Sequence, residues 1–567
     1  MNGVVRRLVL LVFLVLALSA GSGAARSTQA IVGIYPSGTT FAASGAAPAH
    51  PASSVALAMP VGAVDDATIL VSGAQNVAIQ SPVLAGPLEL KLLFAHYVSV
   101  DGKAVPDALL PWDGSQRSAE HTNQPVWLQV TVPYGTAAGG YTGSVVVVAD
   151  GTRTSVPISV TVSAVALPRS NEVSGSLLTA FNFAPQSYGA KVNALYGVPA
   201  TTSLPELFSF FASYRLSPNN WGYGNPSRAS GYTSDRRWWL DKAGEMVAAA
   251  GQPGQFASMW IPISNNRWSA STYVGGRSPY KPQAWCRYLR SVHGFWQKHG
   301  WLSSYPYLWG MDEPGLTRYR VVAGQAKAAH ACFSGSHVIV TGRPTAENRF
   351  LWNGGKDDVD DWVVLASRYY GQYTNPAQSQ RGVSNATENL RLINAARRRG
   401  KQIWAYTYDA ASHSTPGFTA TEPLSDPRLF VDWTALEGIT GLLYGQGTTT
   451  YSKGNPLDSN DREAGSYVLV YPGRNGPIAS ARLEVIREGI EDWEIMNVVR
   501  HKHGAAAVRR LLAGLFSTTS AGAKLGCTVG CPLKMGTPYS WPTWSHDATT
   551  PQKVAQMRAA ALQAAAS

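Results

Sequence analysis

Alternation of apolar and polar positions dominates the first part of the chain, from residue 30 to residue 168. Runs such as "LELKLLFAHYV", "VWLQVTV" and "SVPISVTVS" are rich in β-branched residues and alternate in the manner of half-buried strands. Clusters of Gly, Pro, Asp and Thr, such as "PYGTAAGGYTG", separate these runs, and no helical period of useful length intervenes. The pattern predicts an all-β sandwich over residues 30–168.

After residue 168, short apolar runs alternate with longer segments of helical period. The runs that we interpret as strands are 174–183, 215–221, 255–264, 305–314, 337–344, 360–371, 401–410 and 439–447. Eight strands, each followed by a helix or a link, predict an α/β domain with the (β/α)8 TIM-type barrel fold over residues 169–505. A doubly wound open sheet is the alternative, but the Gly-rich phosphate turn that usually follows an early strand of such a sheet is not found.

The two ends of the chain have their own patterns. Residues 1–25 combine Arg6 and Arg7 with an apolar run and then small residues, which is typical of a secretory signal peptide. An uncleaved N-terminal anchor is the alternative, and no later run reaches the ~20 apolar residues of a spanning helix. The protein is therefore expected to be secreted or extracytoplasmic, in the cell envelope. Residues 506–567 predict a peripheral extension of a loop and an Ala-rich helix.

Composition narrows the class of partner. Hydrophobic residues make up 45% of the chain and charged residues 14%, which fits a folded protein. The 18 Trp, 25 Tyr and 15 Phe supply flat rings on which sugars stack, although such rings are also ordinary core material. Removal of Arg6 and Arg7 takes the formal charge from +12 to +10, and the arginines are spread along the chain. We expect a glycan or polysaccharide partner, no nucleic acid, and no stable membrane insertion after signal removal; the oligomeric state stays open.

Four cysteines in an exported chain allow at most two disulfides. Cys527 and Cys531 lie in one Gly-rich loop, "GCTVGC", and are the expected pair, which leaves Cys286 and Cys332. A zinc site would need further ligands at matching spacing, and the neighbouring histidines are not so placed. Since no nucleotide, flavin or metal motif stands out, we expect no cofactor.

The strongest candidate chemistry is the adjacent pair Asp312 and Glu313 in "YLWGMDEPG", at the end of the predicted fourth barrel strand. Catalytic side chains of such barrels lie at the C-terminal ends of strands. Neighbouring strand residues point to opposite faces, so both carboxylates reach one pocket only if the strand bulges or stops. Gly310 permits a bulge, and Pro314 prevents the ladder from continuing.

The adjacency of the two carboxylates restricts their chemistry. They cannot stand on opposite sides of a sugar as acid and nucleophile, because that arrangement needs about 5 Å or more between them. They suit a reaction in which the 2-acetamido oxygen of the substrate attacks the anomeric carbon. One carboxylate then orients the acetamido N–H, and the other protonates the departing oxygen. The alternatives are that Glu313 acts while Asp312 only caps the loop, or that both are structural.

Two stretches of the sequence resemble glycoside hydrolase family 123, a large and mostly uncharacterised family that is also known as a domain of unknown function. They are "WGMDEPG" at 309–315 and "LVYPGRNGPIASARLEVIREGIEDWEIM" at 469–496. The stretch at 125–151 resembles the β-sandwich that usually precedes the barrel of this family. The resemblance implies a retaining β-N-acetylgalactosaminidase with substrate assistance, in which Asp312 holds the acetamido group and Glu313 is the general acid and base.

One departure from the family accompanies this resemblance. Gly445, in "GLLYGQG", stands where such sequences usually carry a tryptophan after the tyrosine. The missing ring would open or reshape a sugar-binding subsite. A carbohydrate-binding or cell-wall protein without activity is therefore an alternative to an enzyme.

Other residues at predicted strand ends are candidates for substrate binding. Asp409 is the strongest of them, because a carboxylate placed at the end of a barrel strand is more often functional than structural. On a sugar without an acetamido group, Asp409 would serve as a separate nucleophile beside Glu313. The other candidates are Tyr408, Trp309, Tyr370, Arg368, Tyr444 and Trp260.

The segment "RLEVIREGIEDWE" predicts a helix with an apolar stripe. Its acidic residues are a second cluster of carboxylates, and helical spacing favours a solvated, salt-bridged face over a second active site. These residues are Glu484, Glu488, Glu491, Asp492 and Glu494.

Overall fold

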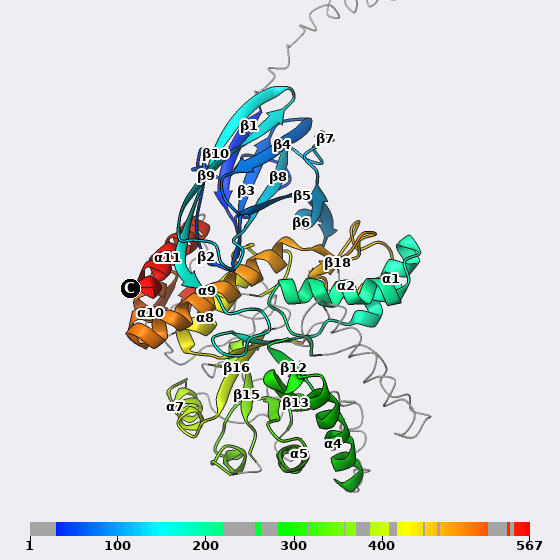
Figure 1. Cartoon of the computed structure of the whole chain (residues 1–567), viewed down its shortest axis with the longest axis vertical. Coiled ribbons are helices and arrows are strands. Elements are labelled where there is room, and N and C mark those ends of the chain that lie inside the picture. The colour runs from blue at the N-terminus through cyan, green and yellow to red at the C-terminus, as the bar shows by residue number, and fades with distance from the viewer. Residues whose placement is uncertain are drawn as a thin grey trace, which may run out of the picture.

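The structure is a computed structural model that describes most of the chain. The described residues are 30–219, 256–261, 282–315, 318–355, 358–369, 386–407, 417–445, 448–461, 465–519, 541–544 and 549–567. The predicted signal peptide lies outside them. Figure 1 shows an all-β domain above a ring of strands and helices, with the long helix α9 (Ala481–His503) between the two.

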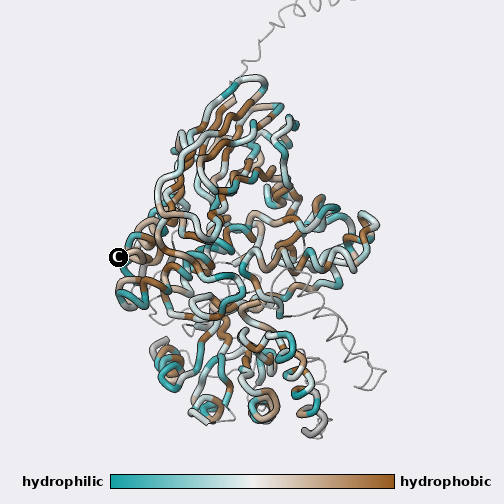
Figure 2. Tube along the Cα trace, viewed as in Figure 1, coloured by the Kyte–Doolittle hydropathy of each residue, from teal (hydrophilic) through white to brown (hydrophobic). Residues whose placement is uncertain are grey.

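The N-terminal β-domain contains two five-stranded sheets with the strand orders β1-β3-β8-β5-β6 and β2-β10-β9-β4-β7. Its longest strand, β10, buries Val156, Ile158, Val160 and Val162 at alternate positions, as the sequence pattern predicts. Buried apolar residues of both sheets belong to one core, and Figure 2 shows hydrophobic trace along these strands. The strands are β1 (Ile31–Pro36), β2 (Val55–Val61), β3 (Val64–Ser72), β4 (Asn76–Leu84), β5 (Glu89–Val100), β6 (Lys103–Trp112), β7 (Arg117–Ser118), β8 (Asn123–Thr131), β9 (Gly139–Ala149) and β10 (Thr152–Ala166).

The second part of the chain builds a parallel sheet of seven described strands in the order β11-β17-β16-β15-β14-β13-β12. These are β11 (Leu178–Phe181), β12 (Ser258–Trp260), β13 (Tyr305–Met311), β14 (His337–Thr341), β15 (Asp361–Leu365), β16 (Gln402–Thr407) and β17 (Gly441–Tyr444). Of the predicted strand at 215–221, the described residues 215–219 form a single parallel bridge, between Pro218 and Phe181. Since proline cannot donate to a ladder, a bridge in place of a strand is expected there. The sheet is thereby nearly closed, consistent with a (β/α)8-like barrel.

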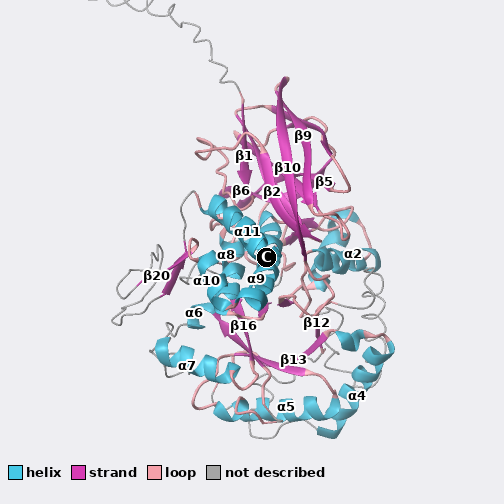
Figure 3. Cartoon of the chain, turned by 60° about the vertical axis from the view of Figure 1, so that its left-hand side comes forward, coloured by secondary structure: helices cyan, strands magenta, loops and turns pink. Residues whose placement is uncertain are grey.

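Alternate residues of the barrel strands separate into two cores. The interior core includes Tyr307, Ile339, Val363, Trp404 and Leu443. The residues between them pack outward against the helices. Figure 3 shows α4 (Pro282–Lys298), α5 (Tyr319–Cys332) and α7 (Ala386–Arg397) on the outer side of the strands. The other α-helices among the described residues between 169 and 480 are α1 (Pro185–Tyr196), α2 (Ala200–Ser213), α6 (Ala366–Tyr369) and α8 (Asp426–Glu437).

A disulfide joins two neighbouring barrel helices. Cys286 of α4 bonds to Cys332 of α5, with their Cα atoms 5.1 Å apart. The sequence left these two cysteines without an expected bond. The pair that we expected, Cys527 and Cys531, lies outside the described residues.

Helix α9 differs from its prediction, because its acidic face is buried and not solvated. Glu484, Glu488 and Glu491 are each at most 1% exposed. Arginines pair with them: Arg428 of α8 pairs with Glu488, and Arg487 of α9 itself pairs with Glu484 at 2.5 Å. The predicted salt bridges are therefore present, but the prediction of a solvated face was wrong, because a helix pattern alone does not reveal which other elements cover its polar face.

The C-terminal extension is an integral part of the molecule and not peripheral. It contains α10 (Ala505–Leu512), the hairpin of β20 (Phe516–Thr519) and β21 (Trp541–Trp544), and α11 (Thr550–Ala566). Arg558 of α11 is 2% exposed and pairs with Asp65 of β3 at 3.1 Å and with Asp492 of α9 at 2.5 Å. The last helix therefore ties the β-domain to the barrel.

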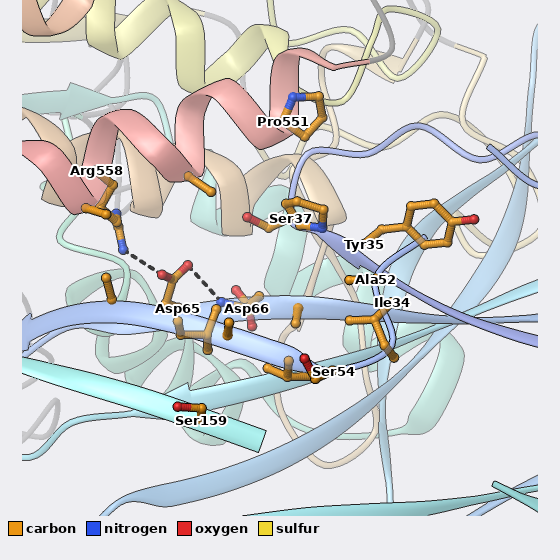
Figure 4. Close-up of a pocket in the computed structure, with 18 of the residues that line it drawn as sticks. Ile34, Tyr35, Ser37, Ala52, Ser54, Asp65, Asp66, Ser159, Pro551 and Arg558 are labelled. Carbon is orange, nitrogen blue, oxygen red and sulfur yellow. Dashed lines mark hydrogen bonds and ion pairs between the residues drawn. The ribbon is translucent and has the colours of Figure 1, made fainter. Parts of the chain in front are cut away.

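A cavity of about 370 Å³ lies beside this contact, between the β-domain and the helices α8 and α11. Figure 4 shows Arg558 pointing across it to Asp65, with Ser37 and Pro551 on its rim. No residue of the barrel strands lines it. It is therefore separate from the barrel opening where the candidate chemistry lies. Within the described residues, no helix has the length and apolarity needed to cross a membrane.

Candidate active site

Strand β13 contains a bulge, which the glycine in its sequence permits. Trp309 pairs with Ile339 and Met311 pairs with the next residue, Val340, so that Gly310 is the extra residue on the bulged strand. The inward and outward positions exchange at this point: Trp309 contacts the interior core, whereas Met311 belongs to the outer core. The bulge therefore places the following position, Asp312, on the interior side of the barrel.

Glu313 reaches the interior side of the barrel through its own backbone conformation. Its φ is 36°, in the left-handed region that a non-glycine residue adopts only at a local cost. The chain turns here, where Pro314 follows, and the Glu313 carboxylate accepts a hydrogen bond from the Tyr406 hydroxyl. Tyr406 lies next to the last residue of β16 and belongs to the interior core. Both adjacent carboxylates thus contact residues at the C-terminal opening of the barrel.

Thr341, the last residue of β14, connects the two halves of the pair. Its hydroxyl lies 2.8 Å from Asp312 Oδ1, to which it donates, and the Glu313 N–H donates to it at 2.7 Å. Thr341 is 1% exposed, and it shares the inward phase of Ile339 two residues earlier. One side chain from an adjacent strand thus contacts both catalytic candidates.

The site changes the acidity of Asp312. Its side chain is exposed on one side, but protein surrounds the remainder, and this desolvation is the largest cause of a raised pKa. The hydrogen bond from Thr341 lowers the pKa, and the neighbouring charge of Glu313 raises it. The net result is that Asp312 takes up a proton more readily than an ordinary aspartate. Glu313 is half-buried.

Two of the predicted aromatic residues lie beside this opening. Trp309 is half-buried on the interior side of β13, and Trp260 is half-buried at the end of β12. Both pack against the interior core. Their role as sugar-stacking surfaces stays a prediction.

Tyr444 is the predicted binding residue that the structure contradicts. It is fully buried in the outer core, and its hydroxyl donates to the Ser466 carbonyl at 2.7 Å. The interior position belongs to Leu443, its neighbour on β17. The prediction failed because both residues are large and apolar, so the sequence does not reveal the phase of so short a strand.

Gly445 lies just beyond this strand, in the inward phase of Leu443. Its carbonyl accepts a hydrogen bond from Asn182 at 3.1 Å. A Cβ atom at Gly445 would meet only Leu443 Cδ2, at 3.9 Å, among described atoms. The position therefore has room for a side chain, and the glycine leaves that room open.

The other predicted binding residues are less informative. Arg368 lies in α6, which follows β15 directly. Asp409, Tyr408 and Tyr370 lie outside the described residues, so the pairing of Glu313 with Asp409 stays a prediction. Among the residues that the structure describes, no group of three or more His, Cys, Asp or Glu is arranged to hold a metal ion.

Thr341 and Tyr406 were not among the residues predicted for the site. Both lie in the inward phase near the ends of predicted strands, "HVIVT" and "QIWAYT". That phase was the signal that could have found them, since an inward hydroxyl at a strand end faces the barrel opening. Neither residue has a titratable carboxylate or an unusual neighbour in sequence, so the pattern attracted no attention.

Comparison with known proteins supports the fold. No curated protein matches the sequence. The structure of a family 123 glycoside hydrolase from Clostridium perfringens superposes with a TM-score of 0.64 at 13% identity, over 94% of this chain and 98% of that chain. An identity this low shows the fold alone.

Other solved structures are less similar. A candidate α-galactosidase from Bacteroides fragilis has a TM-score of 0.31 at 8% identity, over 78% of this chain and 77% of that chain. The β-glucuronidase of Parabacteroides merdae has a TM-score of 0.26 at 11% identity, over 76% of this chain and 50% of that chain. Neither score carries an argument about fold. Residues 264–499, by contrast, match the family model of the glycoside hydrolase 123 catalytic domain, as the sequence resemblance predicted, and the chain therefore carries a catalytic domain of this glycoside hydrolase family.

Proposed function

We propose that the protein is an exported, retaining exo-glycosidase that releases a terminal β-linked N-acetylhexosamine, similar to N-acetylgalactosamine, by substrate-assisted catalysis. The observation that carries the proposal is the contact of two adjacent carboxylates, Asp312 and Glu313, with inward residues at the C-terminal opening of the barrel. An ordinary strand would point them to opposite faces. The bulge at Gly310 and the left-handed turn at Glu313 overcome that constraint.

The proposed reaction has two steps. In the first, the acetamido carbonyl oxygen attacks the anomeric carbon, the glycosidic bond breaks, and Glu313 gives its proton to the departing oxygen. Asp312 accepts the acetamido N–H and balances the positive charge of the cyclic oxazolinium intermediate. In the second step, Glu313 takes a proton from water, which attacks the anomeric carbon and restores the acetamido group. Two inversions give net retention of configuration.

Three further observations support parts of this proposal. The half-buried Trp309 and Trp260 beside the opening fit the apolar face of a sugar ring. The family 123 enzyme from Clostridium perfringens is described in connection with glycolipid glycan hydrolysis, which supports a glycan as the class of substrate. The pattern of residues 1–25 supports export.

The first test is isosteric removal of each carboxylate. We expect Glu313→Gln and Asp312→Asn each to lower kcat on an aryl β-N-acetylhexosaminide by about 10²–10⁴-fold, the usual contribution of a positioned acid or base. The matched control is Glu388→Gln, which removes an exposed carboxylate from the outer helix α7 and should leave kcat unchanged. Circular dichroism and melting temperature check that all three variants fold.

The substrate series separates the alternatives. The wild type should hydrolyse aryl glycosides with the 2-acetamido group far faster than their 2-hydroxy counterparts, and a thiazoline mimic of the cyclic intermediate should inhibit it. Full activity of Asp312→Asn would refute substrate assistance. Hydrolysis of 2-hydroxy glycosides that depends on Glu313 and Asp409 would instead support a double displacement. Polysaccharide binding without product release would support a binding protein.

A further inference from the structure

The Thr341 hydroxyl has two acceptors within hydrogen-bond distance but only one proton to donate. It lies 2.7 Å from the Glu313 nitrogen, 2.8 Å from Asp312 Oδ1 and 3.2 Å from the Met311 carbonyl oxygen. A hydroxyl has one proton to donate and two lone pairs to accept. Since the Glu313 N–H can only donate, it occupies a lone pair. The single hydroxyl proton must then go either to Asp312 or to Met311.

Charge decides between these two acceptors. The Asp312 contact is the shorter one, and an ionised carboxylate binds a hydroxyl proton more strongly than a neutral carbonyl does. When Asp312 is ionised, the hydroxyl donates to it. When Asp312 takes up a proton, the hydroxyl is free to turn to the Met311 carbonyl. The direction of the Thr341 proton is therefore coupled to the ionisation of Asp312.

We propose that Thr341 is the positioning residue of the carboxylate pair, with one hydroxyl that fixes the turn at Glu313 and holds Asp312 as the carboxylate that accepts a donor from the substrate. Only the identity of that donor, the acetamido N–H, rests on the proposed function. The positioning role itself follows from the contacts of Thr341. Thr341 touches no reacting atom and acts through its two neighbours.

The surroundings of Asp312 explain why such a residue is needed. Among the described residues, the charged group that changes the pKa of Asp312 is Glu313, on the same segment, and Tyr406 of β16 bonds to Glu313 in turn. Desolvation and the Glu313 charge both raise the pKa of Asp312, and Thr341 is the group that lowers it. Without that donor, Asp312 would spend more of its time protonated and unable to accept an N–H.

The alternative is that Thr341 only holds β13 and β14 together. The pH dependence of the enzyme distinguishes this structural role from the positioning role. The hydroxyl of Thr179 in β11 is a matched control, because it is also 1% exposed and also accepts a backbone N–H at 2.7 Å, from Ser217. It bonds to no carboxylate in the described chain. Thr179→Val should therefore cost stability to a similar degree without changing the pH profile.

The experiment compares Thr341→Val, Thr341→Ser and Thr179→Val with the wild type. The ionisation of Asp312 is followed by the carboxyl ¹³C resonance of the free enzyme, assigned through Asp312→Asn, and kcat/KM is measured against pH. For Thr341→Val we expect Asp312 to ionise at higher pH, the acid limb of kcat/KM to move the same way, and kcat/KM at neutral pH to fall about tenfold or more. Thr341→Ser should restore all three.

An unchanged Asp312 titration in Thr341→Val, or the same displacement in Thr179→Val, would overturn the proposal. Should Thr341→Val fail to fold, Thr341→Cys offers a weaker donor of similar volume, and it must displace the titration in the same direction. The titration needs no substrate. A wild type that proves inactive on acetamido sugars would therefore refute the proposed function and leave this test of Thr341 intact.

Discussion

At the residue scale, hydroxyl groups from two different strands donate to the two carboxylates of the pair. Thr341 donates to Asp312 and Tyr406 donates to Glu313. A neutral hydroxyl stabilises the carboxylate less strongly than a guanidinium does, and it can also accept a hydrogen bond from the carboxyl group once that group is protonated. This suits a residue such as Glu313, which must give up a proton in one step and regain it in the next.

Replacement of Tyr406 by Phe tests this reasoning. The ring keeps its place in the interior core, but the Glu313 carboxylate loses a donor that fixes its rotamer. We expect kcat to fall about tenfold with little change in KM, because an orienting hydrogen bond to a charged group is worth ~1.5–3 kcal/mol. Steady-state kinetics on the best aryl glycoside provide the measurement.

Tyr307→Phe is the matched control for that variant. Tyr307 belongs to the same interior core, and within the described part of the chain its hydroxyl makes one long contact, 3.4 Å, with the Pro218 carbonyl. Its removal should leave kcat within about twofold of the wild type. Equal losses in both variants would mean that general packing of the barrel interior, and not the bond to Glu313, governs the rate.

The candidate site was predictable wherever its signal is local in the sequence. The adjacency of Asp312 and Glu313, the glycine that permits a bulge and the proline that ends the strand all lie within "GMDEP". Thr341 and Tyr406 act across strands, and only the assembled barrel reveals which strand-end residue faces which. The error at Tyr444 has a similar cause. In a four-residue strand with two large apolar neighbours, the sequence does not show which of the two faces the barrel interior.

At the scale of elements, the close packing between paired barrel strands limits which side chains a strand position can accept. Trp404 of β16 pairs with Gly441 of β17, and its indole ring lies across the glycine. A Cβ atom at Gly441 would come 2.1 Å from the ring atom Cδ2. The strand order and the alternation were predictable from the sequence, since eight apolar runs alternate with helical segments. This particular contact was not, because it depends on register.

Gly441→Ala should therefore destabilise the barrel. Overpacking of a well-filled core costs ~1–3 kcal/mol, which should lower the melting temperature by several degrees. Gly445→Ala is the control four residues later, where the only described atom within 4 Å of the new Cβ lies 3.9 Å away. Differential scanning calorimetry measures the melting temperatures of the two variants. Equal melting temperatures would show that Trp404 moves aside without cost.

At the scale of the whole molecule, a buried ionic layer joins the β-domain to the barrel along α9 (Figure 1). Besides the buried pair of Arg482 and Asp107, four buried arginines face eight buried carboxyl groups there among the described residues, so full ionisation would leave four uncompensated negative charges. Some carboxyl groups must keep their protons. The arginines are Arg215, Arg428, Arg487 and Arg558, and the acids are Asp65, Asp66, Asp432, Glu484, Glu488, Glu491, Asp492 and Glu494.

This excess of acids predicts a loss of stability toward alkaline pH. Desolvation raises the pKa of Glu488 to about 7 and that of Glu494 to about 8, whereas both groups titrate near 4.5 when unfolded. The folded state therefore holds these protons more tightly than the unfolded chain. Their stabilising effect is complete below pH ~4.5 and is lost as pH rises through 7 to 8. Each group contributes on the order of 1 kcal/mol per pH unit over that window.

Denaturant unfolding between pH 5 and pH 9 measures this effect, and Glu494→Gln identifies its source. The amide cannot ionise but keeps an oxygen for Arg215, which lies 3.0 Å from Glu494 Oε2 in the wild type. We expect the variant to lose less stability than the wild type as pH rises, whereas the exposed control Glu388→Gln should follow the wild type. Parallel curves for all three proteins would mean that Glu494 is ionised throughout. The layer would then carry its excess charge at neutral pH, and the two domains would be joined in spite of it.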